Sequence, residues 1–379
     1  MTQAAVTFDI AIIGAGIAGA SLAYRLAPQR RVLLIERESQ PGMHSTGRSA
    51  AMFMETYGPP GVRALTRASR AFYEAPPPGF CDQPLVTPRG ALYVAAPGQE
   101  KLLEQTRAEL APNCPGLKTL GREQTLALVP CLKPDRVTGA LLDPDSMDID
   151  VHALHQGFLR GFRTAGGALQ CNANVRSSRR TGGAWEIGLA DATTVLAATV
   201  VNAAGAWADE VAALFGAQAV GLTPCRRSAF TFDAPAGMAF AHWPAVVGID
   251  EGWYFKPDAG RLLGSPANAD PTVPHDVVPE ELDIATGIFR IEEATTLTIR
   301  RPHRTWAGLR SFVDDGELVI GYDTACEGFF WLAAQGGYGI QSAAGASALA
   351  AALLQRLPLG DDLARFGVDP ATFKPARLR

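Results

Sequence analysis

The sequence predicts an α/β protein of two domains, in which a Rossmann-type domain is discontinuous and a second domain is built on an antiparallel sheet. Three observations carry this prediction: a strand–turn–helix–strand unit at the N-terminus, buried strands that recur along the chain, and a length of 379 residues. At roughly 150 residues per domain, that length accommodates two domains. Because we find no linker and no internal repeat, we expect the second domain to consist of insertions into the first.

Composition excludes several classes of protein. Hydrophobic residues make up 47% of the chain and charged residues only 19%, which excludes disorder. A net charge of −4 without a dense Lys/Arg run argues against a nucleic-acid partner. The six cysteines show no metal-ligand spacing, so we expect reduced thiols, no metal and a cytoplasmic protein. No signal peptide is expected, because the N-terminus has no basic region and glycines interrupt its apolar stretch. No transmembrane segment is expected either, because the uncharged stretch 328–355 is typical of a buried helix.

The N-terminal residues predict a βαβ unit. Phe8 to Ile13 form an apolar run typical of a buried strand, and Ile17 to Leu26 predict a helix with small residues toward the sheet. Arg31 to Ile35 predict the second strand. Further helices are expected at residues 62–73, 100–110, 122–129, 151–165, 281–293 and 340–356, and further strands at 90–95, near 169 and 175, and at 185–189, 198–202, 226–232, 253–257 and 318–322.

Three glycines between the first strand and the helix predict dinucleotide binding. Gly14, Gly16 and Gly19 form the pattern G-x-G-x-x-G, and Glu36 ends the second strand. The first glycine permits a tight turn, the second lets the backbone approach a pyrophosphate, and the third lets helix and strand pack closely. The helix N-terminus offers unpaired N–H groups to the phosphates, and the carboxylate can accept hydrogen bonds from a ribose.

The glycine pattern does not distinguish FAD from NAD, because both cofactors use it. Two later segments favour FAD. Residues 44–50 form a small polar loop suited to a long embedded cofactor, and residues 335–341 are glycine-rich and are expected to open the long last helix. The N–H groups at that helix start could face the part of a flavin where negative charge develops on reduction.

With these motifs, the sequence resembles the D-amino acid oxidase/dehydrogenase superfamily of FAD enzymes, from about Phe8 to the C-terminus. Within the superfamily it looks most like the bacterial FAD-dependent D-arginine dehydrogenases. The resemblance lies in residues 14–21, 40–51, 62–72, 154–161, 201–207, 226–230, 256–270, 282–312 and 327–341.

The resemblance implies hydride transfer from the substrate Cα to flavin N5. The resulting imino acid hydrolyses to a 2-oxo acid and ammonia. The electrons are expected to pass to a quinone or an artificial dye, with weak reaction with oxygen. Two alternatives remain open: a flavin amine oxidase of secondary or N-methyl amino acids such as sarcosine or proline, and a non-catalytic FAD-binding subunit.

The expected FAD-binding domain comprises residues 1–83, 144–215 and 306–379, and the substrate domain comprises 84–143 and 216–305. FAD is expected to be non-covalent, because Cys326 lies ten residues before Gly336, the wrong place for the cysteine linkage of related amine oxidases. The residues expected to bind FAD are Gly14, Gly16, Ile17, Ala18, Gly19, Glu36, Arg37, His44, Ser45, Thr46, Arg48, Ser49, Ala50, Val175, Ala204, Gly205, Trp207, Gly308, Gly336, Gly337, Tyr338, Gly339, Ile340 and Gln341.

The resemblance also implies a substrate site for a D-amino acid. Arginine side chains bind carboxylates with two parallel hydrogen bonds, so two of them can fix the orientation of Cα. Tyrosines can close over the substrate, and a glycine carbonyl can accept a hydrogen bond from its amine. The matching residues are Arg227 and Arg310 for the carboxylate, Tyr57 and Tyr254 for closure, and Gly337 and Gln341 near the amine and the flavin edge.

Three positions depart from the arginine dehydrogenases. Met52 stands where they have a histidine, Ala91 where they have a glutamate for the cationic substrate end, and Met54 where they have a smaller polar residue. The departures predict a pocket without its acid and with more apolar surface. Glu55 could compensate, but on an extended segment it should face away from Met54.

Other candidate residues have ordinary explanations. His152 and His155 lie three apart on an expected helix, but no further ligand completes a metal site, so surface or capping histidines are expected. Arg226 should point to the opposite strand face from Arg227 and be solvated. Residues 248–252, which begin and end with glycine, are interpreted as a mobile loop over the site.

Overall fold

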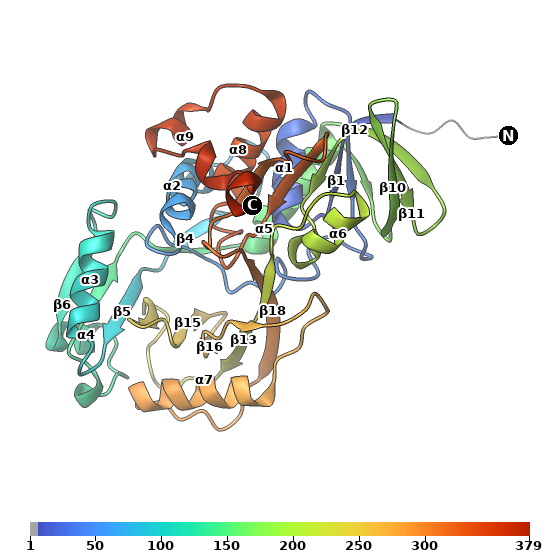
Figure 1. The fold of residues 1–379 in the computed structure, drawn as a ribbon. Coiled ribbons are helices and arrows are strands. Elements are labelled where there is room, and N and C mark those ends of the chain that lie inside the picture. The colour runs from blue at the N-terminus through green and yellow to red at the C-terminus, as the bar shows by residue number, and fades with distance from the viewer. Residues whose placement is uncertain (1–6) are drawn as a thin grey trace.

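Two large sheets organise the computed structural model, which describes residues 7–379 (Figure 1). The first sheet has eight strands in the order β10-β11-β12-β1-β2-β9, with β20 beside β12 and β19 beside β20. β1 pairs in parallel with both β2 and β12, as a Rossmann-type unit requires. Its strands are β1 Thr7–Ile13, β2 Val32–Ile35, β9 Ala168–Gln170, β10 Val175–Thr181, β11 Ala184–Leu189, β12 Thr194–Asn202, β19 Val319–Tyr322 and β20 Phe329–Ala333.

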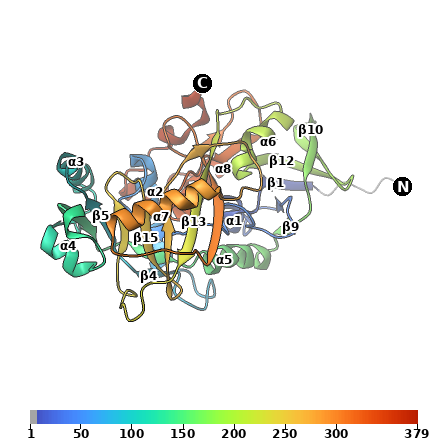
Figure 2. The same ribbon diagram turned by 90° about the horizontal axis from the view of Figure 1, so that it is seen from below.

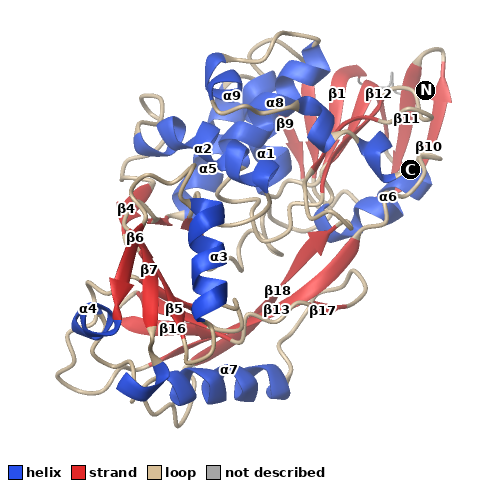
Figure 3. Cartoon of the chain, turned by 60° about the vertical axis from the view of Figure 1, so that its left-hand side comes forward, coloured by secondary structure: helices blue, strands red, loops and turns tan. Residues whose placement is uncertain are grey.

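Helices pack on the first sheet because its central strands are apolar on both faces. α1, α2, α5 and α8 gather beside it (Figure 3), and their buried side chains form one core with Ile10, Ile12 and Leu34. The small residues of α8 permit close packing: a Cβ on Gly345 would lie 2.4 Å from the carbonyl oxygen of Leu65. The helices are α1 Ile17–Leu26, α2 Pro60–Glu74, α5 Val151–Thr164, α6 Ala208–Leu214, α8 Ala343–Gln355 and α9 Asp361–Arg365, with short 3-10 turns at Gly205–Trp207, Pro370–Phe373 and Pro375–Leu378.

The second sheet has nine strands in the order β17-β13-β16-β15-β14-β5-β7-β6, with β18 beside β13. The pair β14 and β5 is parallel and the other pairs are antiparallel, so the expected antiparallel sheet is in fact mixed. Helix α7 covers its outer face (Figure 2). The elements are β5 Ala91–Ala95, β6 Lys118–Gly121, β7 Gly139–Asp143, β13 Thr223–Phe232, β14 Ala245–Gly248, β15 Tyr254–Asp258, β16 Arg261–Ser265, β17 Asp270–Pro271, β18 Arg304–Phe312, α3 Glu100–Leu110, α4 Arg122–Leu128, α7 Glu281–Ala294 and a 3-10 turn at Pro134–Arg136.

A small third sheet has the order β3-β8-β4. Its strands occur where the chain passes from one large sheet to the other: β3 and β4 between β2 and β5, and β8 between β7 and β9. β3 (Met52–Phe53) and β4 (Val86–Pro88) both pair antiparallel with β8 (Met147–Ile149). Met52 lies opposite Asp148 in this register. The sheet thereby fixes a predicted substrate-site residue against a carboxylate.

The expected elements are largely present, with one shifted helix boundary and one corrected side-chain environment. The last helix begins at Ala343 instead of residue 340, because Ala334 and Gly336 take positive φ angles of 56° and 51° and the following residues form turns. Arg226 is not solvated: its Nε lies 2.8 Å from Asp283 on α7 and its Nη1 lies near Glu280. The predicted domain limit at residue 305 falls inside β18, and the division into domains stays a prediction.

Among residues 7–379, no helix combines the length and the apolar character that crossing a bilayer requires.

Asp323 ties the C-terminus to the first sheet. Its carboxylate accepts hydrogen bonds from the backbone N–H groups of Ala325 and Cys326, each at 2.9 Å, from Trp331 Nε1 at 2.9 Å and from Arg379. Burial alone would raise the pKa of Asp323, but these hydrogen bonds outweigh it and lower the pKa to about 2.

We predict that Asp323→Asn lowers the free energy of unfolding at pH 7 by about 2 kcal/mol. The folded pKa lies below the unfolded value, so this contribution is present above about pH 4 and disappears as the pH falls toward 2. Urea unfolding at pH 7, 5 and 3.5 measures it. Asp314→Asn, on an exposed side chain, is the matched control, and equal losses in both variants would contradict the prediction.

Candidate active site

The turn after β1 brings three backbone segments unusually close together. Gly14 has a φ of +99°, and a Cβ there would lie 2.4 Å from the carbonyl oxygen of Ala203 at the end of β12. A Cβ on Gly19 would lie 1.9 Å from the carbonyl oxygen of Gly14. These glycines therefore let α1 start directly at the sheet edge, where its N–H groups face a cavity.

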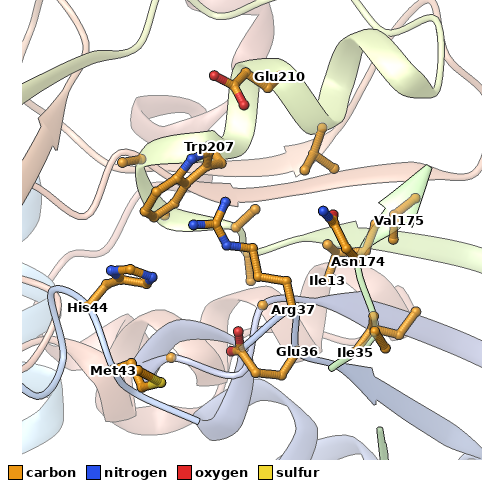
Figure 4. Close-up of a pocket in the computed structure, with 18 of the residues that line it drawn as sticks. Ile13, Ile35, Glu36, Arg37, Met43, His44, Asn174, Val175, Trp207 and Glu210 are labelled. Carbon is orange, nitrogen blue, oxygen red and sulfur yellow. The ribbon is translucent and has the colours of Figure 1, made fainter. Parts of the chain in front are cut away.

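That cavity has a volume of about 380 Å³ and lies at the carboxyl ends of β1, β2 and β12 (Figure 4). Arg37 stacks its guanidinium over the ring of Trp207 at 3.8 Å, and the ring of His44 lies 4.8 Å from the same indole. Glu36 is buried and accepts a hydrogen bond from Ala15 N at 3.0 Å. The predicted cofactor residues that line this cavity are Gly14, Gly16, Glu36, Arg37, His44, Ser45, Thr46, Val175, Ala204, Gly205 and Trp207.

His155 supports the glycine turn from behind, which corrects its expected place on the surface. It is buried on α5, and its ring Nε2 lies 2.8 Å from the carbonyl oxygen of Ala15. Burial lowers the pKa of His155, and because a carbonyl only accepts, the neutral ring donates from Nε2. His152, on the same helix, is exposed as expected. Among residues 7–379, no group of three or more histidine, cysteine or acidic side chains could hold a metal.

A second cavity continues from the start of α1 toward the second sheet. One buried polar atom in its wall, Gln335 Nε2, has no hydrogen-bond partner within the described chain. An unpaired buried amide is costly, so this donor is suited to an acceptor on a bound group. The predicted cofactor residues in this wall are Gly16, Ile17, Ala18, Ser45, Thr46, Arg48, Ser49, Ala50, Gly308, Gly336, Gly337, Gly339 and Ile340.

Arg227 and Arg310 face a third cavity, which adjoins the second. Neither guanidinium forms an ion pair within residues 7–379. Arg310 Nη1 donates to Tyr57 Oη at 3.0 Å, and Arg227 Nε donates to the carbonyl oxygen of Asn268. Burial and the neighbouring charge of Arg310 lower the pKa of Arg227. Two partly or fully buried cations without a carboxylate are unfavourable, and an anion that binds between them relieves this.

The other predicted substrate residues surround the same two arginines. Tyr57, Tyr254, Gly337 and Gln341 all line the third cavity. A Cβ on Gly337 would lie 2.7 Å from Arg310 Nη1 and 3.1 Å from Tyr57 Oη, so only a glycine leaves this corner open. Gln341 is fixed by hydrogen bonds from its Nε2 to Tyr57 O at 3.1 Å and to Thr66 Oγ1 at 3.0 Å.

The remaining wall of the third cavity is mostly apolar. Met52 and Met54 line it together with Ala245 and Val247. Ala91 does not line it: it is fully buried and packs in the apolar cluster that contains Met54. Glu55 faces away, as expected, because its carboxylate pairs with Arg70 Nε at 2.7 Å. Of the three predicted departures, positions 52 and 54 therefore lie in one cavity with the arginine pair, whereas position 91 lies behind the cavity wall.

Two ionisable residues of this cavity were missed by the sequence analysis. Glu251 lies in the segment 248–252 and takes a φ of +54°, and Lys256 lies on β15 two residues after Tyr254. The alternation along β15 was the available signal, since residues 254 and 256 share one face of a strand. Lys256 is buried, and its Nζ lies 2.7 Å from Asp148 Oδ1.

Besides Ala91, the predicted residues Gly19 and Tyr338 and the considered residue Cys326 lie outside the walls of the three cavities. Gly19 acts through packing against Gly14, and the ring of Tyr338 packs at 5.0 Å from that of Tyr57. Cys326 is buried, and its Sγ lies 3.3 Å from the carbonyl oxygen of Phe215.

Comparison with known proteins identifies the fold and the family of this site. The family model described as FAD dependent oxidoreductase (DAO) matches residues 9–353. Mitochondrial dimethylglycine dehydrogenase of Rattus norvegicus is 28% identical over 273 residues, which make up 68% of this chain but only 30% of that relative. The chain thus spans less than a third of the length of this curated relative.

Solved structures share the fold over nearly the whole chain. Glycine oxidase from Geobacillus kaustophilus superposes with a TM-score of 0.82 at 22% identity, covering 96% of this chain and 99% of that one. L-proline dehydrogenase from P. horikoshii superposes with a TM-score of 0.81 at 19% identity, covering 98% of each chain.

FAD is the cofactor of this chain, and the residues present fit it. The glycine turn leaves room for a pyrophosphate at the start of α1, and Glu36 lies at the end of β2 for a ribose. The unpaired Gln335 Nε2 offers a donor in the second cavity. When bound, FAD supplies a two-electron acceptor next to the third cavity.

We predict that the purified protein is yellow and that acid precipitation releases all its FAD into the supernatant. Cys326 cannot form a covalent link, because its thiol lies in the core against Phe215 instead of in a cavity wall. Absorbance of the supernatant and the pellet measures the outcome, and Cys326→Ser should give the same distribution. Flavin that stays with the precipitated wild-type chain would contradict the non-covalent assignment.

Proposed function

Because the chain belongs to the DAO family of FAD-dependent oxidoreductases, we propose that it oxidises D-amino acids at Cα as a dehydrogenase. The observation that carries the proposal is the pair of partly buried guanidinium groups, Arg227 and Arg310, which face a mostly apolar cavity and form no ion pair within residues 7–379. The reaction removes a hydride from Cα and a proton from the amine. Water then converts the imino acid to a 2-oxo acid and ammonia, and a quinone or a dye takes up the electrons.

The carboxylate of the substrate binds between the two arginines. Each guanidinium can donate two parallel hydrogen bonds to a carboxylate, and Tyr57 Oη, which already contacts Arg310, is placed to donate a further one. Tyr254 lines both the second and the third cavity and covers the substrate from β15. These contacts exclude water and fix the direction in which Cα–H points.

The amine of the substrate binds beside the carboxylate. Gly337 lies at van der Waals distance from Arg310 and Tyr57, so a carbonyl acceptor there would hold the amine next to the carboxylate site. With carboxylate, amine and side chain each fixed, only one enantiomer directs its Cα–H at the flavin. The resemblance supplies the D configuration.

The side-chain wall favours uncharged substrates. Ala91 supplies no carboxylate for a guanidinium, Met52 and Met54 are apolar, and Glu55 is bound to Arg70 outside the cavity. A cation that enters such a wall loses water without gaining a partner. The resemblance to D-arginine dehydrogenases stays a prediction. We propose that this chain nevertheless prefers neutral D-amino acids to D-Arg.

A second candidate function is the oxidation of secondary or N-methyl amino acids. The names of two similar proteins, a dimethylglycine dehydrogenase and an L-proline dehydrogenase, favour this candidate. An arginine pair that holds a carboxylate serves these substrates equally well. Anaerobic flavin reduction with sarcosine, dimethylglycine and proline beside the D-amino acids distinguishes the two candidates. A flavin that none of these compounds reduces would instead indicate a non-catalytic FAD-binding subunit.

We predict that Arg310→Ala and Arg227→Ala each lower kcat/KM by roughly 10- to 150-fold while FAD stays bound. The reason is the loss of a charge-assisted hydrogen bond, which contributes about 1.5–3 kcal/mol. Steady-state kinetics with a dye acceptor and the flavin absorbance measure both quantities. Arg261→Ala, which removes a half-exposed arginine of the same domain, is the control. Unchanged kinetics in Arg310→Ala would remove that residue from the site.

We predict that D-Met, D-Leu or D-Phe exceeds D-Arg and D-Lys in kcat/KM, by roughly two to four decades. The apolar group gains from burial, whereas the cation finds no carboxylate at position 91. Ala91→Glu should raise the activity on D-Arg and lower it on D-Leu. The L-isomer of the best substrate should reduce the flavin more slowly. D-Arg as the best substrate, or no change in Ala91→Glu, would contradict this assignment of the wall.

A further inference from the structure

We propose that Lys256 is a second polar anchor of the substrate cavity and binds an oxygen acceptor, amide or carboxylate, at the end of the substrate side chain. The inference rests on the proposed function, because it names the class of amino acid that the same cavity takes. It starts from a lysine that nothing in the glycine or arginine motifs accounts for.

The ammonium group of Lys256 is buried and only partly satisfied. Its side chain is 6% exposed, and its Nζ contacts Asp148 Oδ1 at 2.7 Å. An ammonium group has three N–H donors. Asp148 is its one hydrogen-bond partner among residues 7–379, and Lys256 lines the third cavity. Two donors are therefore left for a group that enters this cavity.

The single carboxylate of Asp148 does not neutralise both cations that contact it, Lys256 and Arg89. Arg89 Nε contacts Asp148 Oδ2 at 2.6 Å, while Arg89 Nη1 donates to the carbonyl oxygens of Ala241 and Trp243. One carboxylate between a lysine and an arginine leaves a net charge of +1. This excess charge is shielded from water, so it favours an acceptor and repels a cation.

The strand register places Lys256 at the side-chain end of the cavity. Val247 pairs with both Tyr254 and Tyr93, and Ala245 pairs with Ala91. Lys256 follows Tyr254 by two residues on the same strand face, which puts it in the row of Ala245 and Ala91. This row is farther from the turn at 249–252 than the row of Tyr254.

The residues that the second and third cavities share identify the end of the third cavity that lies near the flavin-binding residues. Arg227, Arg310 and Tyr254 line both the second cavity, where the flavin-binding residues lie, and the third. Lys256 lines only the third. The substrate carboxylate and Cα thus belong near the shared residues, and Lys256 is reached by the far end of a side chain.

The wall therefore combines an apolar stem region with a polar end. Ala245, Val247 and Met52 can contact methylene groups, and Lys256 can donate to an oxygen beyond them. A purely apolar side chain would leave two buried N–H donors unpaired, so it should rank below an amide or a carboxylate of the same length while still ranking above a cation. D-Gln and D-Glu match this arrangement, whereas D-norleucine has the length without the acceptor.

The test is anaerobic reduction of the holoenzyme flavin by D-Gln, D-Glu, D-norleucine and D-Lys, in wild type and in Lys256→Met. We expect D-Gln or D-Glu to exceed D-norleucine in the wild type by at least about tenfold, as a charge-assisted hydrogen bond implies. In Lys256→Met that ratio should fall by roughly 10- to 150-fold. The ranking of D-Gln against D-Glu shows whether the acceptor is neutral or anionic.

Two controls separate specificity from folding. Lys133→Met removes another lysine of the same domain, whose Nζ bonds the carbonyl oxygen of Glu292, and should leave all ratios unchanged. Lys256→Gln replaces the ammonium group by an uncharged amide that has two N–H donors, and it should retain part of the preference. FAD content and the melting temperature check each variant, and the wild-type ranking alone decides the matter if Lys256→Met does not fold.

The inference is overturned if D-norleucine matches or exceeds both D-Gln and D-Glu in the wild type, or if the ratio is the same in Lys256→Met. Reduction by apolar D-amino acids with no effect of Lys256 would leave the proposed function standing and remove only the anchor. Absence of flavin reduction by every amino acid would overturn the proposed function itself.

Discussion

Two partly buried guanidinium groups that face one cavity without an ion-pair partner are the constraint on which the site depends. Like charges repel, so a rigid frame has to hold them until an anion arrives. β13 and β18 provide it through a continuous antiparallel register from Thr223 opposite Phe312 to Thr231 opposite Arg304. Within that ladder, Arg227 lies opposite Gly308 and Arg310 opposite Cys225. The second sheet is therefore the part of the fold that creates the anion site, and the first sheet places the cofactor beside it.

The features that the sequence predicted well are local ones. β1, α1 and β2 agree with expectation to within one residue, because an apolar run, a glycine turn and a helical pattern each act over a few neighbours. Glu55 also faces away as expected, since alternation along an extended segment fixes its direction. The start of α8 was predicted too early, because the positive φ angles of Ala334 and Gly336 depend on the loop's packing.

The features that the sequence could not predict depend on which segments meet. His155 looks like a surface histidine until α5 is packed against the turn at Ala15. Arg226 does point away from Arg227, but α7 returns over that face and brings Asp283 to it. Lys256 becomes a cavity residue only through the register of β15 with β14. The contacts of His155 and Arg226 join residues far apart in sequence, so no local pattern encodes them. Lys256 lies on a hairpin, and alternation after Tyr254 gives its strand face, but its contact with Asp148 is also long-range.

Charge around the third cavity is distributed in a way that bears on substrate choice. Among the described residues that line it, Glu251 is the one carboxylate, and it lies on the turn beside the row of Tyr254. Burial raises the pKa of Glu251, while Arg227 and Arg310 act in the opposite direction, which places this carboxyl near the anion-binding pair. The opposite end holds Lys256. A cationic side chain that reached this end would thus meet the ammonium group of Lys256. The substitution Ala91→Glu adds a carboxylate beside this end but leaves the positive charge of Lys256 in place.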